Sequence, residues 1–350
     1  MRGAASLRED HVAVSPSAGA EAALELDEFF WAWMMIRSRA ITFRVQRGTD
    51  GVVEARRCMV PVVDFMNHAC APPPSASVSA PTGSRLAEEL VAAAAAHPGP
   101  NVTLERRDDA VAWRATVDIS PGEEVLWTYG DLSNEELWLW YGFVPDPPLH
   151  AGAAVTFQLP EAALRGGLGA VARGDSKDEA AARLALLMRA GVFSDGSGDE
   201  WDRRVLEFEL RLGSPPRVLA GIAGIMCCTA DESKSITAAV SGGGTGVGGE
   251  GEAVVDVRLS AESRRRAGRY VAYILDQVEP TVCGESGEVD WEDDVASPEG
   301  VDVMTWRAAC RLRRGARGVF LAARPALTDE SLLDRGEWID AAVASLLVAC

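Results

Sequence analysis

The stretch of sequence that decides the fold is residues 58–68, which read CMVPVVDFMNH. The apolar run at 59–63 predicts a buried strand, and Asp64, Asn67 and His68 place polar groups at its end. Polar groups in such a place destabilise a fold unless they are hydrogen bonded. An isolated Asn-His pair is most often a turn with a locally satisfied histidine, so its meaning depends on what accompanies it.

Further motifs accompany it in a fixed order along the chain. They are RSRA at 37–40, VPVVDFMNH at 60–68, DISPGEEV at 118–125, YG at 129–130, SN at 133–134 and YGFV at 141–144. Each motif alone is weak evidence, but the ordered set resembles the SET-domain protein methyltransferases, in the branch of the Rubisco large-subunit lysine methyltransferase. The motifs cover roughly residues 27–145, and the rest of the chain matches only by its helical character.

The resemblance implies an α+β fold in two parts. The first is a SET-domain fold of small sheets with a pseudoknot-type arrangement, expected over residues 19–160 with an insertion at 69–100. An all-α domain of the type that binds protein substrate is expected over 161–350, and residues 1–18 are expected to be loose. In the family, a segment with a Gly-x-Gly turn precedes these motifs and completes the cofactor pocket. No such segment precedes Asp27, so we expect a chain corresponding to the C-terminal two-thirds of such an enzyme. We expect it to bind the cofactor roughly a hundredfold more weakly, because two or three hydrogen bonds to the cofactor would be lost.

The resemblance also implies a reaction and the residues that perform it. The reaction is methyl transfer from S-adenosylmethionine to a protein lysine. The implied site residues are Tyr141 and Tyr129 for catalysis, Arg39, Asn67 and His68 for the cofactor, and Asp64 for the substrate.

This chemistry agrees with what these residue types can do. A lysine amine, with a free pKa of about 10.4, must lose its proton before it attacks a methyl group, and burial lowers its pKa. A tyrosine hydroxyl orients such an amine without carrying charge, and no metal is required. Of the four tyrosines, Tyr129 and Tyr141 lie in the motifs, while Tyr270 and Tyr273 are expected together on the core face of one helix.

Two other functions stay open. The family enzyme has further site tyrosines between the Asn-His pair and the Gly-Glu motif and soon after Tyr-Gly-Phe. This chain has no tyrosine at 69–128. Soon after Tyr-Gly-Phe, where the family enzyme has the other tyrosine, this chain has His150, Ala151 and Gly152. The target could therefore be histidine, as in a related branch. The chain could also be a catalytically inactive protein-binding module built on the same fold.

Composition limits the partners. The chain of 350 residues has 52 acidic and 34 basic side chains and a net charge of −18, which argues against binding nucleic acid or anionic membranes. Seven scattered cysteines without a CxxC pair predict reduced thiols inside a cell and no structural zinc. No apolar run reaches the length of about 18 residues that a membrane span requires. We expect a cytoplasmic protein, with nucleus and plastid as alternatives, whose protein substrate docks partly on the helical half.

Periodicity and turn residues predict the elements. The expected helices are 19–38, with an apolar stripe in the core, then 84–96, one starting with the capping box at 133–136, 178–190, 200–211, 216–230, 258–279, 301–322 and 328–349. The expected strands are 59–63, 101–106, 111–117, 124–129 and 154–159. Connections are expected at 39–50, at the turn Asp108-Asp109, at the Gly-rich 241–251 and at the acidic 284–299.

Overall fold

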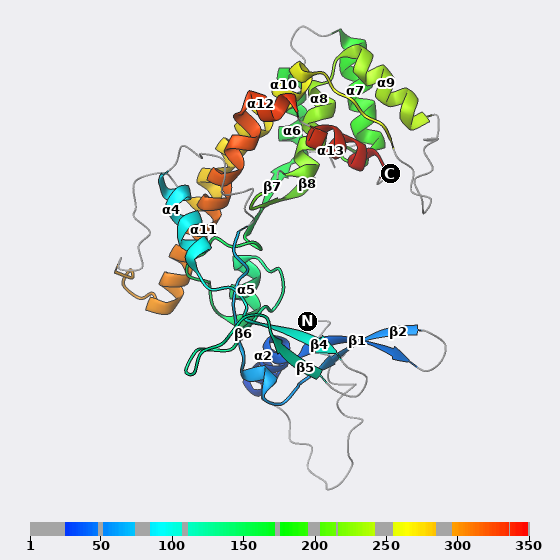
Figure 1. Ribbon diagram of the computed structural model, residues 1–350. Coiled ribbons are helices and arrows are strands. Elements are labelled where there is room, and N and C mark those ends of the chain that lie inside the picture. The colour runs from blue at the N-terminus through cyan, green and yellow to red at the C-terminus, as the bar shows by residue number, and fades with distance from the viewer. Residues whose placement is uncertain are drawn as a thin grey trace. The chain divides into compact units, whose positions relative to one another are not determined.

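A computed structural model describes residues 25–47, 52–73, 85–106, 111–171, 176–194, 204–214, 216–241, 255–284, 296–335 and 337–348 (Figure 1). These residues form helices and small two-stranded sheets, so the predicted α+β class is confirmed. The chain divides into two compact units, one up to Phe65 and one from Met66 onward. The predicted loose N-terminus, the turn at Asp108-Asp109 and most of both long linkers lie outside the described residues.

The first unit begins with helix α2, Leu26–Arg39, and continues into a hairpin of β1, Ile41–Arg47, and β2, Val52–Cys58. The strands pair antiparallel with Ile41 opposite Cys58, so the connection predicted over 39–50 is wrong. The predicted core stripe of the first helix is also wrong for its described residues, because no residue of α2 is buried and Leu26 is 66% exposed.

The strand predicted over 59–63 does not form. Strand β2 ends at Cys58, a turn follows at Pro61 and Val62, and the 3-10 helix η1 spans Val63–Phe65. Val62 is 75% exposed and has a positive φ of 75°, which a strand does not allow. Pro61 explains the break, because proline cannot donate a hydrogen bond to a neighbouring strand.

The second unit begins with the elements that carry most of the motifs. They are β3 at Asn67–His68, α4 at Arg85–Ala96, β4 at Val102–Arg106, β5 at Val111–Ala115, β6 at Leu126–Trp127 and α5 at Asn134–Tyr141. Helix α4 and the capping box of α5, in which Ser133 and Glu136 bond each other's backbone, are confirmed. Strand β6 is much shorter than the predicted 124–129 because only two of its residues pair.

A second hairpin leads into the helical half. Strand β7, Ala154–Pro160, is confirmed and pairs antiparallel with β8, Val205–Arg211. The helix predicted over 200–211 is therefore wrong. The residues of β8 alternate between exposed Glu207 and Glu209 and buried Phe208 and Leu210, which is the period of a strand. The domain boundary at residue 160 stays a prediction, although β7 and β8 pair across it.

The remaining elements are helices. They are α6 at Glu161–Val171, α7 at Lys177–Arg189, α8 at Arg217–Cys227, α9 at Ala230–Ser241, α10 at Ala261–Cys283, α11 at Val303–Thr328, α12 at Glu330–Asp334 and α13 at Glu337–Val348. The predicted helices 178–190, 258–279 and 301–322 are confirmed within a few residues at most ends. The helix predicted over 216–230 is α8, which ends three residues earlier, and the helix predicted over 328–349 is two helices in the structure. Helices α6 and α9 were not predicted.

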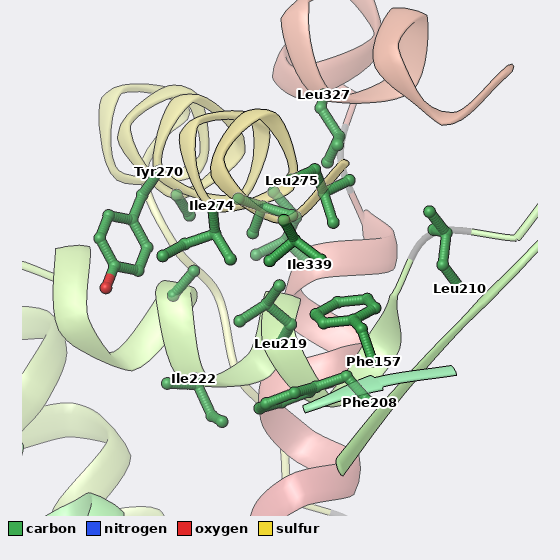
Figure 2. Packing of buried hydrophobic residues seen from close by; sticks show 14 of the residues in the cluster. Phe157, Phe208, Leu210, Leu219, Ile222, Tyr270, Ile274, Leu275, Leu327 and Ile339 are labelled. Carbon is green, nitrogen blue, oxygen red and sulfur yellow. The ribbon is translucent and has the colours of Figure 1, made fainter. Parts of the chain in front are cut away.

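The hydrophobic core of the second unit surrounds α8, whose residues from Leu219 to Cys227 are all buried (Figure 2). Helices α10 and α13 pack on α8, and Phe157 of β7 stacks on Phe208 of β8 with ring centroids 5.6 Å apart. Tyr270 points into this core as predicted, but Tyr273 is 58% exposed, so the expectation of a shared core face is wrong for Tyr273.

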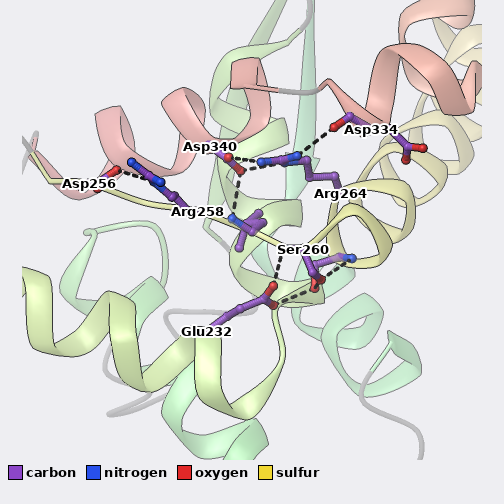
Figure 3. Close-up of polar contacts among 9 residues, drawn as sticks. Glu232, Asp256, Arg258, Ser260, Arg264, Asp334 and Asp340 are labelled. Carbon is purple, nitrogen blue, oxygen red and sulfur yellow. Dashed lines mark hydrogen bonds and ion pairs between the residues drawn. The ribbon is translucent and has the colours of Figure 1, made fainter.

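Polar contacts join the helices at one edge of this core (Figure 3). Arg264 of α10 pairs with the carboxylate of Asp340 on α13, which also accepts the backbone N–H of Leu259 at 3.2 Å. Glu232 of α9 accepts hydrogen bonds from the backbone of Ser260 and the hydroxyl of Ser263. Each carboxylate therefore bonds more than one partner, as a partly buried charge requires.

Replacing Gly221 by alanine should destabilise the protein because of the contact between α8 and α13. An added Cβ at Gly221 would lie 2.7 Å from the carbonyl oxygen of Ala342. We expect Gly221→Ala to lower the free energy of unfolding by about 1–3 kcal/mol, measured by urea unfolding. The matched control is Gly166→Ala on α6, where nothing lies within 4 Å of an added Cβ and a gain of up to about 1 kcal/mol is expected. Equal midpoints for the two variants would contradict the packing described.

Candidate functional site

The Asn-His pair forms a very short strand whose partner is distant in the chain. Strand β3 pairs in parallel with β6, with Asn67 opposite Leu126 and His68 opposite Trp127. Asn101 reinforces the junction, because its side chain accepts the N–H of Leu126 and donates to the carbonyl of Glu124, both at 2.8 Å. Sequence reasoning missed Asn101, which is the first residue of a predicted strand and belongs to no motif.

His68 holds the backbone of a second motif. Its Nδ1 atom accepts the N–H of Tyr129 at 3.0 Å, so the neutral ring carries its proton on Nε2, which lies 3.1 Å from Cys70 Sγ. Burial lowers the pKa of His68 from 6.5 to about 4, because the imidazolium loses its hydration. His68 is thus uncharged near pH 7 and remains a hydrogen-bond acceptor toward Tyr129.

The two predicted catalytic tyrosines lie in contact. The rings of Tyr129 and Tyr141 have centroids 4.6 Å apart and are tilted by 31°. The hydroxyl of Tyr129 donates to the carbonyl of Met66 at 2.8 Å, directly before the Asn-His pair. Tyr141 ends α5, and Gly142 caps that helix with a φ of 80°, which turns the chain so that the Phe143 ring lies 6.0 Å from the His68 ring.

The structure brings together Asn67, His68, Tyr129 and Tyr141 within the second unit. Asn67 is exposed, and its carboxamide nitrogen donates to Glu124 Oε1 at 2.6 Å, which links the Asn-His pair to the Gly-Glu motif. These contacts join parts of the chain that are about sixty residues apart in sequence. They do not test the role of any of these residues, which stays a prediction.

The other two predicted site residues lie in the first unit. Arg39 Nη1 donates to the carbonyl of Asp64 at 2.8 Å, and its guanidinium lies over the ring of Phe65 at 5.8 Å. The Oδ1 atom of Asp64 has no hydrogen-bond partner among the described residues. Arg39 and Asp64 are thus near each other, and their roles in binding cofactor and substrate stay predictions.

A second buried histidine belongs to the same region. His150 Nε2 lies 2.9 Å from Asn134 Oδ1, and the Asn134 carboxamide nitrogen donates to the carbonyl of Pro148 at 2.7 Å. Burial, with a smaller contribution from nearby His68, lowers the pKa of His150 to about 4. The sequence placed Asn134 in a motif and His150 where the family has a tyrosine, but no sequence pattern connects the two residues.

A cavity of about 340 Å³ opens beside these residues, and we call it the His68 pocket. Its lining includes His68, Cys70, His97, Phe143, His150 and Arg311. Three of the four histidines of the chain line this one cavity, together with an arginine from the distant helix α11. A cavity of this size is in the range of small-molecule sites.

The described ranges hold no group of three or more His, Cys, Asp or Glu side chains that could bind a metal ion, so the pocket histidines do not form such a group. Within the same ranges, no helix combines the length and apolar character that crossing a membrane requires.

Comparison with protein families and with curated proteins found no match. Similar solved structures include three of LSMT. The SET domain of LSMT bound to lysine and AdoHcy has 16% identity and a TM-score of 0.40, and covers 94% of this chain. Rubisco LSMT bound to AdoMet, and the same protein bound to sinefungin and monomethyllysine, each have 17% identity, a TM-score of 0.43 and 94% coverage.

This chain spans 59% of the length of each of these solved chains. With TM-scores below 0.5 and identities below 25%, the likeness carries no functional argument, and function has to rest on the residues of this chain.

The low pKa of His150 predicts a pH dependence of stability. Between pH 6.5 and about 4 the unfolded chain binds a proton at this residue and the folded chain does not. Stability from this group is therefore complete above pH 6.5 and is lost as the pH falls, by up to about 1.4 kcal/mol per pH unit.

The variant His150→Gln keeps an amide donor for Asn134 and removes the titration. Unfolding in urea between pH 7 and 4.5 should show a shallower loss of stability for His150→Gln than for the unmodified chain. Parallel curves for the two proteins would contradict a buried neutral His150.

Proposed function

We propose that this protein is an S-adenosylmethionine-dependent protein N-methyltransferase of the SET class, acting on a lysine side chain. One observation supports it above the others. The backbone N–H of Tyr129 bonds His68 Nδ1 at 3.0 Å while the Tyr129 ring contacts the Tyr141 ring. Motifs separated in sequence thus converge on a pair of tyrosines beside a cavity, which is the arrangement that methyl transfer to an amine needs.

The residues present fit the proposed donor. The His68 pocket has room for a substantial part of a nucleoside-sized ligand, with the Phe143 ring and the neutral His68 ring in its lining. The exposed carboxamide of Asn67 would supply a polar contact, while Arg39, in the first unit, stays a candidate through the family resemblance alone. When bound, S-adenosylmethionine provides a methyl group activated by a sulfonium. One of the similar solved structures is bound to AdoMet, but its similarity to this chain is too low to support the proposal.

The proposed reaction depends on orientation and on the protonation of the substrate amine. Tyr141, held at the end of α5, would accept a hydrogen bond from the amine and direct its lone pair to the methyl group. Tyr129, fixed through both its N–H and its hydroxyl, would form the adjacent wall. The Oδ1 atom of Asp64 is buried without a hydrogen-bond partner among the described residues, and Asp64 stays the candidate for contact with the substrate. A neutral His68 adds no positive charge that would repel an ammonium group on entry.

A protein-binding module without catalysis is the second candidate. Helix α2 exposes large apolar side chains, with Leu26 66% and Trp31 67% exposed, as protein-binding surfaces do. Docking of a protein substrate on the helical half fits either function and stays a proposal. Measured binding of the cofactor separates the candidates, since a binding module has no need of it.

Calorimetric titration with S-adenosylhomocysteine, up to millimolar concentration, tests the proposed function. We expect saturable binding by the full chain and about two- to tenfold weaker binding by Asn67→Ala, the loss of roughly one hydrogen bond. The matched control is Tyr273→Phe, at an exposed position of α10, which should bind like the unmodified chain. Absence of saturable binding by the unmodified chain would favour the binding module.

Tyr141→Phe should act on turnover rather than on binding. Its hydroxyl would bond the reacting amine, so we expect turnover to fall on the order of a hundredfold with the affinity for S-adenosylhomocysteine nearly unchanged. Transfer of a labelled methyl group to a panel of folded proteins, with the modified side chain identified by mass spectrometry, provides the measurement. Undiminished turnover would move the role to Tyr129, and label on histidine would correct the substrate.

A further inference from the structure

We propose that Arg311, on helix α11, is a positioning residue that holds the segment 143–147 in the wall of the His68 pocket. This inference rests on the proposed function for the identity of the ligand and goes beyond it by giving the helical half a part in the site itself. No motif in the sequence marks Arg311, which lies 165 residues after its partner Asp146.

The guanidinium of Arg311 contacts that segment at two points. Its Nη2 atom donates to Asp146 Oδ2 at 3.1 Å, and its Nη1 atom approaches the carbonyl of Val144 at 3.5 Å. Arg311, Val144 and Asp146 all line the His68 pocket. A planar guanidinium can bond a side chain and a backbone oxygen at once, which fixes the path of the chain between them more closely than a point charge does.

Glycine allows α11 to come close enough for these contacts. A Cβ at Gly315, one turn beyond Arg311, would lie 2.5 Å from Asn134 Nδ2 and 3.1 Å from the carbonyl of Pro148. The same Asn134 carboxamide bonds Pro148 and His150. Helix α11 therefore meets the chain after Phe143 at two successive turns, once through an ion pair and once through a close backbone approach.

The ion pair is placed to affect geometry more than stability. The side chain of Arg311 is 29% exposed and that of Asp146 is 56% exposed, and pairs this accessible to water contribute little to the free energy of folding. Phe143, at the start of the held segment, has its ring 6.0 Å from His68 and 6.4 Å from Tyr141. A shift of this segment would move the aromatic ring that faces both the pocket and the proposed catalytic tyrosine.

The test compares Arg311→Ala, Asp146→Ala and the double variant in the full chain by calorimetry with S-adenosylhomocysteine. Each single variant should weaken binding by about three- to tenfold, and the double variant no more than either single one, because the two residues act as one pair. Arg311→Lys keeps the charge but loses the planar guanidinium, so its affinity should lie between those of the unmodified chain and Arg311→Ala. The control is Arg307→Ala, at an exposed position one turn earlier on the same helix, for which no hydrogen bond or ion pair to another described residue is found. This variant should bind within about twofold of the unmodified chain.

Two further readouts separate positioning from a structural role. Urea midpoints of all variants should agree with that of the unmodified chain, while the imidazole proton signals of His68 and His150 in NMR spectra should shift in Arg311→Ala and Asp146→Ala but not in Arg307→Ala. Unchanged imidazole signals, additive effects in the double variant, or weaker binding that parallels a lower midpoint would each overturn the proposal. If the unmodified chain binds no S-adenosylhomocysteine, the proposed function fails, and the NMR comparison alone still decides whether Arg311 positions the pocket.

Discussion

The arrangement of the candidate site depends on one hydrogen bond, from the backbone N–H of Tyr129 to Nδ1 of a neutral His68. Strand β3, which carries His68, and strand β6, which ends two residues before Tyr129, pair over only two positions, which is too little to hold two distant segments in register by themselves. Burial keeps His68 uncharged and therefore able to accept this bond, and the side chain of Asn101 fixes β6 from the other side. The contact of Tyr129 with Tyr141 follows from where this bond places Tyr129.

The helical half contributes to the site through the same helix that builds its core. Val319 and Phe320 of α11 are buried in the hydrophobic cluster, while Gly315, about one turn earlier, and Arg311, about two turns earlier, meet the chain that follows α5. Core packing fixes the position of a long helix to within a fraction of an ångström because protein interiors are close packed. Because the helix is rigid, the packing of its buried part also fixes where Arg311 and Gly315 lie. The pocket wall is therefore coupled to the packing of the core.

Local sequence patterns predicted the secondary structure correctly where their periodicity was assigned to the right type of element. The capping box of Ser133 and Glu136 correctly predicted the start of α5. The same pattern occurs at Thr229 and Glu232, where each side chain bonds the other residue's backbone. It marks the start of α9, which was not predicted. The alternation in β8 was also present in the sequence and was taken for a helix. Prediction of a buried strand at 59–63 gave too little weight to Pro61, which cannot donate in a sheet.

The sequence by itself determined most of the helices, because caps and periodicity act within a few residues of the chain. Through the resemblance that its ordered motifs carry, it also gave the α+β class and the candidates Asn67, His68, Tyr129 and Tyr141. Only the tertiary structure decided that the two tyrosines touch, that the half-buried His68 and the buried His150 are neutral, and that α2 lacks buried residues. It alone joined Asn134 to His150 and Arg311 to Asp146. Contacts between residues from sixteen to 165 positions apart are set by how helices and strands pack, and burial, which sets the charge of a histidine, exists only once that packing has formed.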